Sequence, residues 1–220
     1  HEFVIVGGDG GPFPAVRPTD VLLIAPGERY DVLLTVAAEP GTKTWLTSAP
    51  VDRGHAELAG FDVMELRVGS ATTEPIAALP EQFTAAIEPL PVSPLTPVRT
   101  FRLGEDLDSP TGPRFSINDE LWPFNTPITA TLGDLEVWSI ENEGDGDHPF
   151  HLHGVFFQVL ERGGVPEPQV SWKDTVRIGP HETLRLAVRH ETPGMWMYHC
   201  QIPEHAEGGM TGDLMVTETP

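Results

Sequence analysis

The sequence has little cysteine, few basic residues and no long apolar run. Cys200 is the one cysteine among 220 residues, which makes an intrachain disulfide impossible and excludes a disulfide-stapled scaffold. Lys and Arg number 13 against 33 Asp and Glu, and the resulting net charge of −20 argues against nucleic acid or an anionic membrane surface as a partner. Because the chain lacks a run of about 18 apolar residues, we expect no segment that spans a membrane.

Glycine and proline, in contrast, are abundant. The chain has 22 Gly and 23 Pro, a composition that suits short strands joined by many turns and disfavours a helical bundle. Short β-branched and aromatic runs bounded by Gly, Pro and Asp indicate strands. The predicted strands cover residues 3–6, 21–25, 30–37, 44–47, 61–68, 98–103, 114–118, 135–141, 150–160, 174–178, 183–189, 195–200 and 212–217. The predicted fold class is therefore all-β.

A proline-rich stretch divides the chain. Residues 70–97 contain six prolines, a density that cannot continue a sheet or a helix, so we expect a linker there. The eight predicted strands of residues 98–220 fit a Greek-key β-sandwich and a complete domain. The five predicted strands of residues 1–69 would leave unpaired sheet edges, so we expect a partial domain whose other strands lie outside this chain or in a partner.

Five of the nine histidines fall into two short clusters. The clusters are HPFHLH, with His148, His151 and His153, and HCQIPEH, with His199, Cys200 and His205; Met210 follows five residues later. Side chains alternate between the two faces of a strand. Two adjacent strands would therefore gather His151, His153 and His199 on one face as an imidazole cluster, with Cys200 on the opposite face.

Cys200, His148, His205 and Met210 form a second predicted site. His148 precedes the rigid Pro149, and the chain after Cys200 loops back through two glycines, so both arms can turn toward the thiol. Two imidazoles, one thiolate and a weakly bound thioether are the ligand set of blue-copper electron-transfer centres. Zinc is the alternative metal, but it would need the thioether as a ligand or an open position.

Each of these features alone would have a purely structural interpretation, since a single buried cysteine is usually a small apolar residue. Their combination at compatible spacings is what predicts metal binding.

Other residues carry weaker hypotheses. Met195 and Met197 share the face of His199 and are expected in the core, and Asp174 either holds a ligand imidazole or caps a strand turn. The carboxylates nearest the clusters, which are Asp147, Glu204 and Glu207, are expected in solvated loops, with shaping of a substrate mouth or proton transfer as the alternative.

The two clusters resemble the copper motifs of the multicopper oxidases, the family of laccases, bilirubin oxidases and cuprous oxidases. The matching stretches are HPFHLHG (148–154) and HCQIPEHAEGGM (199–210). Weaker similarity extends through VGGDGGPFP and LLIAPGERYDVLLTV (6–36), FSINDELWPF (115–124), FQVLERGG (157–164) and WKDTVRI (172–178). The resemblance implies cupredoxin-like domains, with residues 1–69 as the latter half of a middle domain and residues 98–220 as the last domain.

The resemblance also implies roles for the candidate residues. His148, Cys200, His205 and Met210 match the ligands of type 1 copper, whereas His151 matches a type 2 ligand and His153 and His199 match type 3 ligands of a trinuclear copper cluster. In this family a small reductant, phenolic or a metal ion, gives electrons to type 1 copper. The electrons pass through Cys200 and His199 to the cluster, where dioxygen becomes water. A periplasmic or extracellular location follows by the same resemblance.

Two departures from the family pattern matter. The family has a second histidine after the cysteine, but here Gln201 stands in its place, and an amide is a poorer copper ligand than an imidazole. We therefore expect one type 3 copper to be weakly held or absent. The family also completes its cluster with two N-terminal His-x-His pairs, which this chain lacks. The chain alone should not reduce dioxygen, and a missing N-terminal cupredoxin region or another chain is needed.

Two other hypotheses remain open. In the first, the protein is a non-enzymatic blue-copper electron-transfer or copper-binding protein with a degenerate trinuclear site, which Gln201 favours. In the second, it is a structural relative that binds no metal, which the intact set of Cys200 and its three partners argues against. A copper nitrite reductase fits less well, because the loop from Cys200 to Met210 is too compact for that pattern.

Overall fold

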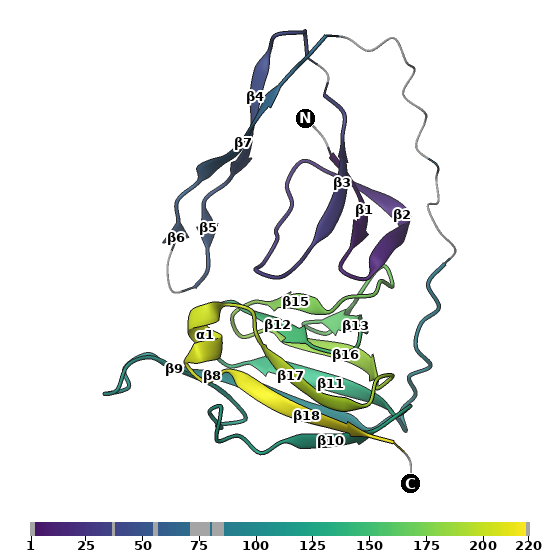
Figure 1. Ribbon diagram of the computed structural model, residues 1–220, viewed down its shortest axis with the longest axis vertical. Coiled ribbons are helices and arrows are strands. Elements are labelled where there is room, and N and C mark those ends of the chain that lie inside the picture. The colour runs from purple at the N-terminus through teal and green to yellow at the C-terminus, as the bar shows by residue number, and fades with distance from the viewer. Residues whose placement is uncertain (1–2, 37, 55–56, 71–79, 81–85, 219–220) are drawn as a thin grey trace.

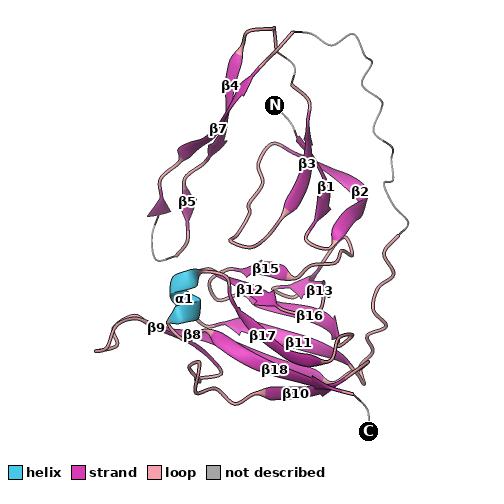
Figure 2. Ribbon diagram, in the orientation of Figure 1, coloured by secondary structure: helices cyan, strands magenta, loops and turns pink. Residues whose placement is uncertain are grey.

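The computed structural model describes residues 3–36, 38–54, 57–70, 80 and 86–218, and it is built almost entirely of strands. Figures 1 and 2 show one short helix, α1 (Pro203–Glu207), at the edge of a lower sandwich of two sheets. The predicted all-β fold class is thus confirmed. No described helix has the length and apolar character needed to cross a membrane.

Residues 98–217 form two facing sheets. The five-stranded sheet has the order β10 (Ile128–Thr131), β18 (Thr211–Thr217), β17 (Gly194–Cys200), β12 (His148–Leu152) and β15 (Thr175–Ile178). The six-stranded sheet has the order β14 (Val165–Pro166), β13 (Phe157–Arg162), β16 (Thr183–Arg189), β11 (Leu135–Asn142), β8 (Val98–Asp106) and β9 (Arg114–Ile117). The chain changes sheet between β11 and β12 and again between β12 and β13, which is the behaviour of a β-sandwich.

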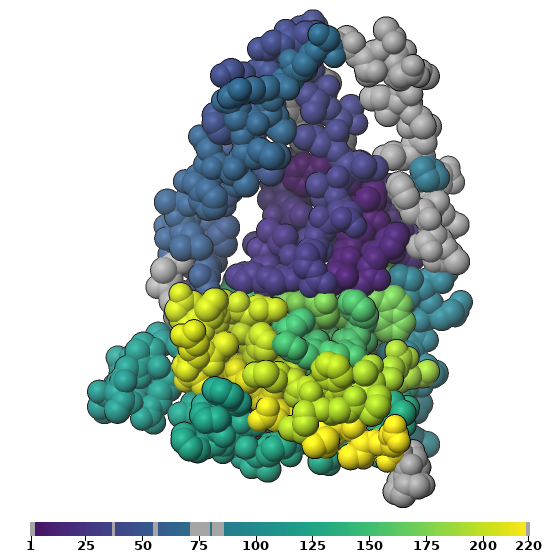
Figure 3. Space-filling view, viewed as in Figure 1, coloured from purple at the N-terminus to yellow at the C-terminus, as the bar shows by residue number. Residues whose placement is uncertain are grey.

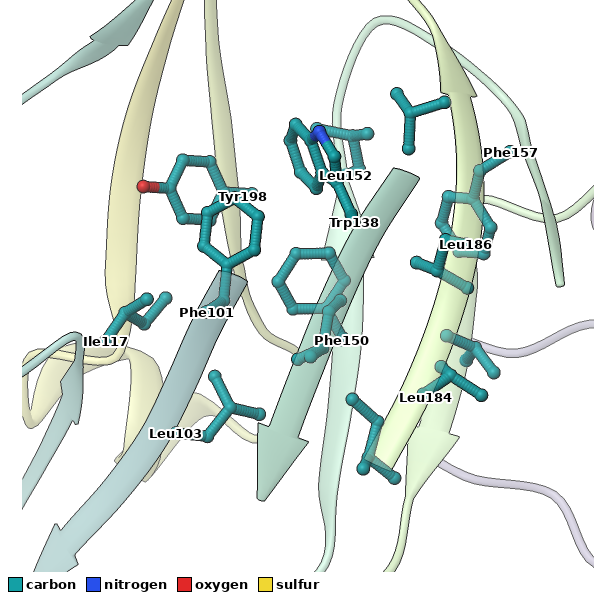
Figure 4. Close-up of a cluster of buried hydrophobic side chains, with 14 of the residues drawn as sticks. Phe101, Leu103, Ile117, Trp138, Phe150, Leu152, Phe157, Leu184, Leu186 and Tyr198 are labelled. Carbon is teal, nitrogen blue, oxygen red and sulfur yellow. The ribbon is translucent and has the colours of Figure 1, made fainter. Parts of the chain in front are cut away.

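Aromatic side chains from both sheets fill the space between them (Figure 4). Phe101 and Trp138 come from the six-stranded sheet, and Phe150 and Tyr198 come from the five-stranded one. The ring centroids of Phe101 and Tyr198 lie 5.1 Å apart, and those of Trp138 and Phe150 lie 6.2 Å apart. Such tilted contacts between large buried rings hold the sheets face to face.

The pairing of β12 with β17 fixes where the two histidine clusters lie. In this antiparallel register Phe150 lies opposite Cys200, and His151 lies opposite His199. Because side chains alternate along a strand, Phe150 and Cys200 point into the core, whereas His151 and His199 point to the outer face of the sheet. The opposite orientations of Cys200 and His199 expected from the sequence are therefore present: Cys200 belongs to the buried core, and His199 is only partly buried.

The described residues between 3 and 70 form smaller sheets that lie against the sandwich (Figure 3), with β15 on the side of the sandwich that faces them (Figure 1). These sheets are β2–β1–β3, with β1 (Phe3–Gly8), β2 (Gly11–Thr19) and β3 (Tyr30–Leu34), the pair β4 (Lys43–Ser48) and β7 (Phe61–Arg67), and the pair β5 (Val51–Asp52) and β6 (Glu57–Leu58). Many apolar side chains here are exposed, among them Trp45 at 49% and Phe61 at 62%.

Two strand predictions are wrong. Residues 21–25 form no strand; Val21 in this stretch is 71% exposed, and the sheet instead uses Gly11–Thr19. The prolines within Gly11–Thr19 obscure the strand pattern in the sequence. They are tolerated because β2 is an edge strand, where a missing N–H does no harm. The predicted single strand 150–160 is two strands in different sheets, because the chain breaks at Gly154, whose φ is +82°.

The count of strands after residue 97 is also larger than predicted. The two sheets hold eleven strands rather than eight. The additional ones are β10, the short β14 and the second half of the split run, and α1 was not anticipated as a helix. The described part of the proline-rich segment, residues 80 and 86–97, contains neither helix nor strand. The domain boundaries at residues 69 and 98 stay a prediction.

Gly212 on β18 gives the first testable prediction. It pairs with Tyr198, and a Cβ at this position would lie 2.2 Å from the Tyr198 ring, which is itself buried. Gly212→Ala should therefore lower the free energy of unfolding by about 1–3 kcal/mol through overpacking. Gly69→Ala is the matched control, because a Cβ there meets no described atom within 4 Å. The measurement is the urea midpoint of each variant; equal midpoints would contradict the packing shown here.

Candidate functional site

Cys200, His148 and His205 converge on one buried point. The Cys200 Sγ atom lies 3.8 Å from His148 Nδ1 and 3.6 Å from His205 Nδ1, and the two Nδ1 atoms lie 3.0 Å apart. The three residues are 2%, 0% and 7% exposed. They come from the end of β17, the start of β12 and helix α1, so the sandwich edge assembles a site from segments 52 residues apart.

The loop after Cys200 is folded tightly enough to return His205 and Met210 to the same end of the sandwich. Pro203 stands in the first turn of α1, where its lack of an N–H is harmless. The Met210 N–H donates to the His205 carbonyl (3.0 Å), and the Cys200 N–H donates to the Met210 carbonyl (3.1 Å). These two bonds fix the Met210 backbone beside Cys200. The Met210 side chain is fully buried and lies in the core.

The donor set fits a copper ion. Bonds of about 2.0–2.3 Å to one central ion place donor atoms roughly 3–4 Å apart, which matches the three separations found. Burial raises the pKa of the Cys200 thiol to about 12, so the thiolate needs a cation beside it to exist at neutral pH. The three side chains together could hold a metal ion.

Two further side chains contact the imidazoles of this site. The Phe115 ring of β9 stacks on His205 with centroids 3.9 Å apart and planes 16° from parallel. Glu105 of β8 places Oε2 3.6 Å from His148 Nε2, while its Oε1 accepts a hydrogen bond from the Asp145 N–H (2.5 Å). The Phe115 face covers His205 and restricts its rotation. Glu105 also lines a hollow of about 460 Å³.

His151, His153 and His199 form a second group on the outer face of the five-stranded sheet. The Nε2 atoms of His153 and His199 lie 3.0 Å apart, and the ring centroids of the three residues lie 4.7 to 5.3 Å apart. Burial and the neighbouring imidazoles lower the pKa of His153, and burial lowers that of His199 despite its bond to the Cys200 carbonyl. Neutral imidazoles are the form that binds metal.

The strand register links the two groups through adjacent residues. His199 Nδ1 donates to the carbonyl of Cys200 at 2.8 Å, which leaves Nε2 of His199 directed at the cluster. His151 Nδ1 lies 2.9 Å from the Asp174 carbonyl and 2.9 Å from Thr175 Oγ1. The Nδ1 atoms of both histidines are thus engaged by protein oxygens, and each Nε2 remains for a metal.

Asp174 lies against His151 through two of its groups. Its main-chain carbonyl is 2.9 Å from His151 Nδ1, and its carboxylate Oδ1 is 3.6 Å from the same nitrogen. Arg29 binds the carboxylate with two bonds of 2.6 and 2.7 Å. Burial raises the pKa of Asp174, but hydrogen bonds from His151, Arg29 and Thr175 outweigh it and hold the pKa far below its usual value. Arg29 and Thr175 were missed from the sequence.

Three other expectations need correction or completion. Met195 and Met197 are 55% and 37% exposed rather than in the core, because no described element covers the outer face of β17. Asp147 is 8% exposed and pairs with Arg177 at 2.6 Å rather than lying in a solvated loop, whereas Glu204 and Glu207 are exposed as expected. Of the isolated histidines, His190 is buried beside Glu136 and His181 pairs with Asp145, whereas His1 and His55 lie outside the described residues.

Gln201, which stands where a further imidazole was expected, lies against the N-terminal region. A Cβ on Gly27 would come within 2.8 Å of Gln201 Cγ, so only a glycine at the turn of residues 26–27 leaves room for this side chain. The Gln201 N–H donates to the Pro149 carbonyl at 2.8 Å. Its position thus belongs to the contact between residues 3–36 and the sandwich.

A hollow of about 310 Å³ borders the imidazole cluster. Its lining includes His151, His153, Gly154, Phe156 and Asp174. Trp196 packs on Gly154, where a Cβ would lie 2.3 Å from the indole, so the glycine is required for this close approach. The cluster therefore opens to the outside of the five-stranded sheet, whereas Cys200 is closed within the sandwich.

Comparison with known proteins now identifies the family, since the profile of the multicopper oxidases matches residues 94–220. The chain belongs to the multicopper oxidase family. It is 38% identical to a multicopper oxidase of Staphylococcus epidermidis over 99% of this chain and 43% of that protein. It is 29% identical to a laccase of Bacillus subtilis over 99% of this chain and 47% of that protein. The chain thus spans about half the length of these relatives.

Solved structures agree with this membership. The crystal structure of a multicopper oxidase from Aquifex aeolicus superposes with a TM-score of 0.84 at 29% identity, over 98% of this chain and 50% of that one. The predicted cupredoxin-like sandwich is therefore confirmed. The expectations of copper as the cofactor and of an oxidoreductase family are confirmed as well, because laccases and multicopper oxidases are copper oxidoreductases.

The burial of Cys200 leads to the second prediction. In metal-free protein at pH 8, a thiol whose pKa is raised to about 12 carries almost no thiolate and is shielded from reagents. Iodoacetamide should therefore label Cys200 only after unfolding in urea, as mass spectrometry of the intact chain would show. Phe115→Ala is expected to speed labelling because it opens the cover over His205. Full labelling of the folded wild-type chain within minutes would contradict the buried site.

Proposed function

We propose that His148, Cys200, His205 and Met210 hold a type 1 copper that accepts electrons one at a time from a reducing substrate. The observation that carries the proposal is the convergence of one thiol and two imidazole nitrogens within 3.8 Å of one another in the core. The fully buried Met210 is tied by its backbone to both Cys200 and His205, which suits a weak thioether ligand.

Bound copper would supply one-electron redox chemistry at this site. The chain's own residues exclude water, since Phe115, Ile202 and the aromatic core surround the three ligands. They also connect the site to the outer face of the sheet, because Cys200 and His199 are consecutive on β17 and their side chains point in opposite directions. Electrons entering at Cys200 would leave along this strand through His199.

His151, His153 and His199 are proposed as ligands of a partial trinuclear cluster, with His151 at type 2 copper and the other two at type 3 copper. The separations of the three rings support this assignment. Reduction of dioxygen to water, with a phenolic or metal-ion reductant, would then belong to the intact protein. Exposed apolar side chains lie beside these imidazoles, namely Met195, Met197 and Phe156. Such a surface is one that another part of the protein would cover.

The same reasoning supports the proposed domain organisation. Residues 1–69 would be the latter half of a middle cupredoxin domain, residues 70–97 a linker and residues 98–220 the last domain. Exposed apolar side chains on β3, β4 and β7, such as Leu33, Trp45 and Phe61, suit a sheet whose partner strands lie elsewhere. A periplasmic or extracellular location is proposed from family resemblance alone.

A second function is favoured by Gln201. Its side chain lies against Gly27, and the described residues provide no fourth imidazole at this position. A blue-copper protein that relays electrons to another protein, with a cluster that is no longer complete, would fit this arrangement. Oxygen consumption by the intact protein with a phenolic donor distinguishes the enzyme from the carrier.

The third prediction tests the type 1 site. Adding copper to the chain should produce an intense visible absorption from thiolate-to-copper charge transfer, because the thiolate is an immediate ligand. Cys200→Ser should abolish the colour. His153→Ala is the control, since it removes an imidazole of the other group and should leave the colour intact. A colourless wild-type protein that nevertheless binds copper at Cys200 would overturn the type 1 assignment.

The fourth prediction concerns Gln201 in the intact protein, with its N-terminal region present. Gln201→His should raise the copper bound at the cluster, because an imidazole is a better copper ligand than an amide. Copper per molecule is measured by atomic absorption, with Gln201→Asn as a control that adds no imidazole. Unchanged copper content would count against the type 3 assignment. Four-electron oxygen reduction by the 220-residue chain alone would contradict the incomplete cluster.

A further inference from the structure

A chain of hydrogen bonds leads from the N-terminal region to one ligand of the imidazole cluster. Arg29 Nη1 and Nη2 donate to the two carboxylate oxygens of Asp174 at 2.6 and 2.7 Å. The Thr175 hydroxyl donates to Asp174 Oδ1 at 2.7 Å, and Thr175 Oγ1 lies 2.9 Å from His151 Nδ1. Arg29 and Asp174 are 145 residues apart, so the chain crosses between two regions of the protein.

The direction of these bonds decides which nitrogen of His151 carries hydrogen. A hydroxyl has one hydrogen, and Thr175 gives it to Asp174, so its oxygen can only accept from His151. The Asp174 carbonyl, 2.9 Å from the same nitrogen, is also an acceptor only. His151 Nδ1 therefore carries the hydrogen, and the Nε2 lone pair is directed away toward the other imidazoles.

Arg29 holds the first member of this chain in place. Without its two bonds the Asp174 carboxylate could rotate into solvent, since 17% of that side chain is exposed. Thr175 would then be free to donate to His151 Nδ1, which favours hydrogen on Nε2 and blocks that atom as a ligand. Thr175 is fully buried, so its hydroxyl must find a partner among the protein groups around it.

The backbone of Arg29 is fixed by a separate buried group. Asp9, whose side chain is fully buried, accepts from the Arg29 N–H at 2.7 Å and from the Thr175 N–H at 3.3 Å. The same carboxylate pairs with Lys173 at 3.1 Å. Arg29 is thus held between the N-terminal region and the sandwich by contacts that do not depend on Asp174.

We propose that Arg29 is a positioning residue for His151. By fixing Asp174 and Thr175 it keeps His151 in the Nδ1–H tautomer, so that docking of residues 3–36 on the sandwich completes one corner of the imidazole cluster. The metal-binding consequence rests on the proposed function of His151 as a copper ligand, whereas the tautomer itself does not.

The first experiment observes the imidazole directly in the metal-free 220-residue chain labelled with ¹⁵N-histidine. In the wild type, NMR should show His151 as a single Nδ1–H tautomer with a slowly exchanging proton. Arg29→Met should give a mixture of tautomers and loss of the slow exchange, and Arg29→Lys should restore the slow proton only in part, because lysine cannot bind both oxygens. Unchanged His151 signals in Arg29→Met would overturn the proposal.

Two other variants separate positioning from general damage. Arg17→Met removes an arginine that also joins the two regions, through Gln169, but does not contact this chain of bonds; it should leave the His151 signals as in the wild type. Thr175→Val removes the hydroxyl that could donate to His151 Nδ1 and leaves the Asp174 carbonyl as an acceptor, so adding it to Arg29→Met should restore the slowly exchanging Nδ1–H, whereas adding Thr175→Ser should not. If Arg29→Met fails to fold, the partial loss expected of Arg29→Lys, and its recovery when Thr175→Val is added, decide the question in the same way.

A metal titration distinguishes two outcomes, that the positioning role of Arg29 is wrong and that the proposed ligand role of His151 is wrong. With Zn²⁺ alone as a diamagnetic probe, in a Cys200→Ser background, the His151 Nε2 signal should shift, and Arg29→Met should weaken binding about tenfold. A wild-type tautomer that depends on Arg29, with Zn²⁺ binding absent at His151, would uphold the positioning and reject the ligand role. Equal Zn²⁺ affinity in both chains, with an unchanged tautomer, would reject the positioning alone.

Discussion

The register between β12 and β17 is the constraint on which both candidate sites depend. Opposing Phe150 to Cys200 and His151 to His199 places a thiol in the core and two imidazoles on the outer face of the same strand pair. A slip of one residue would exchange these faces and separate Cys200 from His148 and His205. The aromatic core reinforces the register, because Phe150 and Tyr198 from these two strands pack on Phe101 and Trp138 of the other sheet.

Buried charge holds the N-terminal region against the sandwich in a chain that carries few basic residues. The Lys173 ammonium is 10% exposed and lies between Asp9 and Glu28, 3.1 and 3.4 Å away. Burial lowers the pKa of Lys173, but the charges of Glu28, Tyr30 and Asp9 reverse this effect and the pKa is raised overall. Removing one partner of such a buried pair would leave an uncompensated charge, so separation of the two regions at this contact is costly.

Much of the sandwich, and the grouping of the histidines and Cys200 on opposite faces of one strand pair, could be predicted from the sequence, because alternation along a strand and residue spacing are local properties. Features that depend on distant contacts could not. Gly154 interrupts a strand pattern with a φ of +82° and packs closely on Trp196, and the prolines of β2 are tolerated because the strand lies at an edge. Arg29 follows a Pro-Gly turn, and its pairing with Asp174, 145 residues away, has no local signal in the sequence.

Large apolar side chains are exposed both on the sandwich and on the small sheets of the N-terminal region. On the outer face of β17 lie Met195 and Met197, and on the small sheets lie Trp45 and Phe61, all at least 37% exposed. A protein with this much unpaired apolar surface gains stability from any complementary partner, since burying such area is favourable. The imidazole cluster lies beside the first of these surfaces, so a partner that covers Met195 and Met197 would also reach the open side of His153 and His199. Burial of apolar area and completion of the cluster would then be one event.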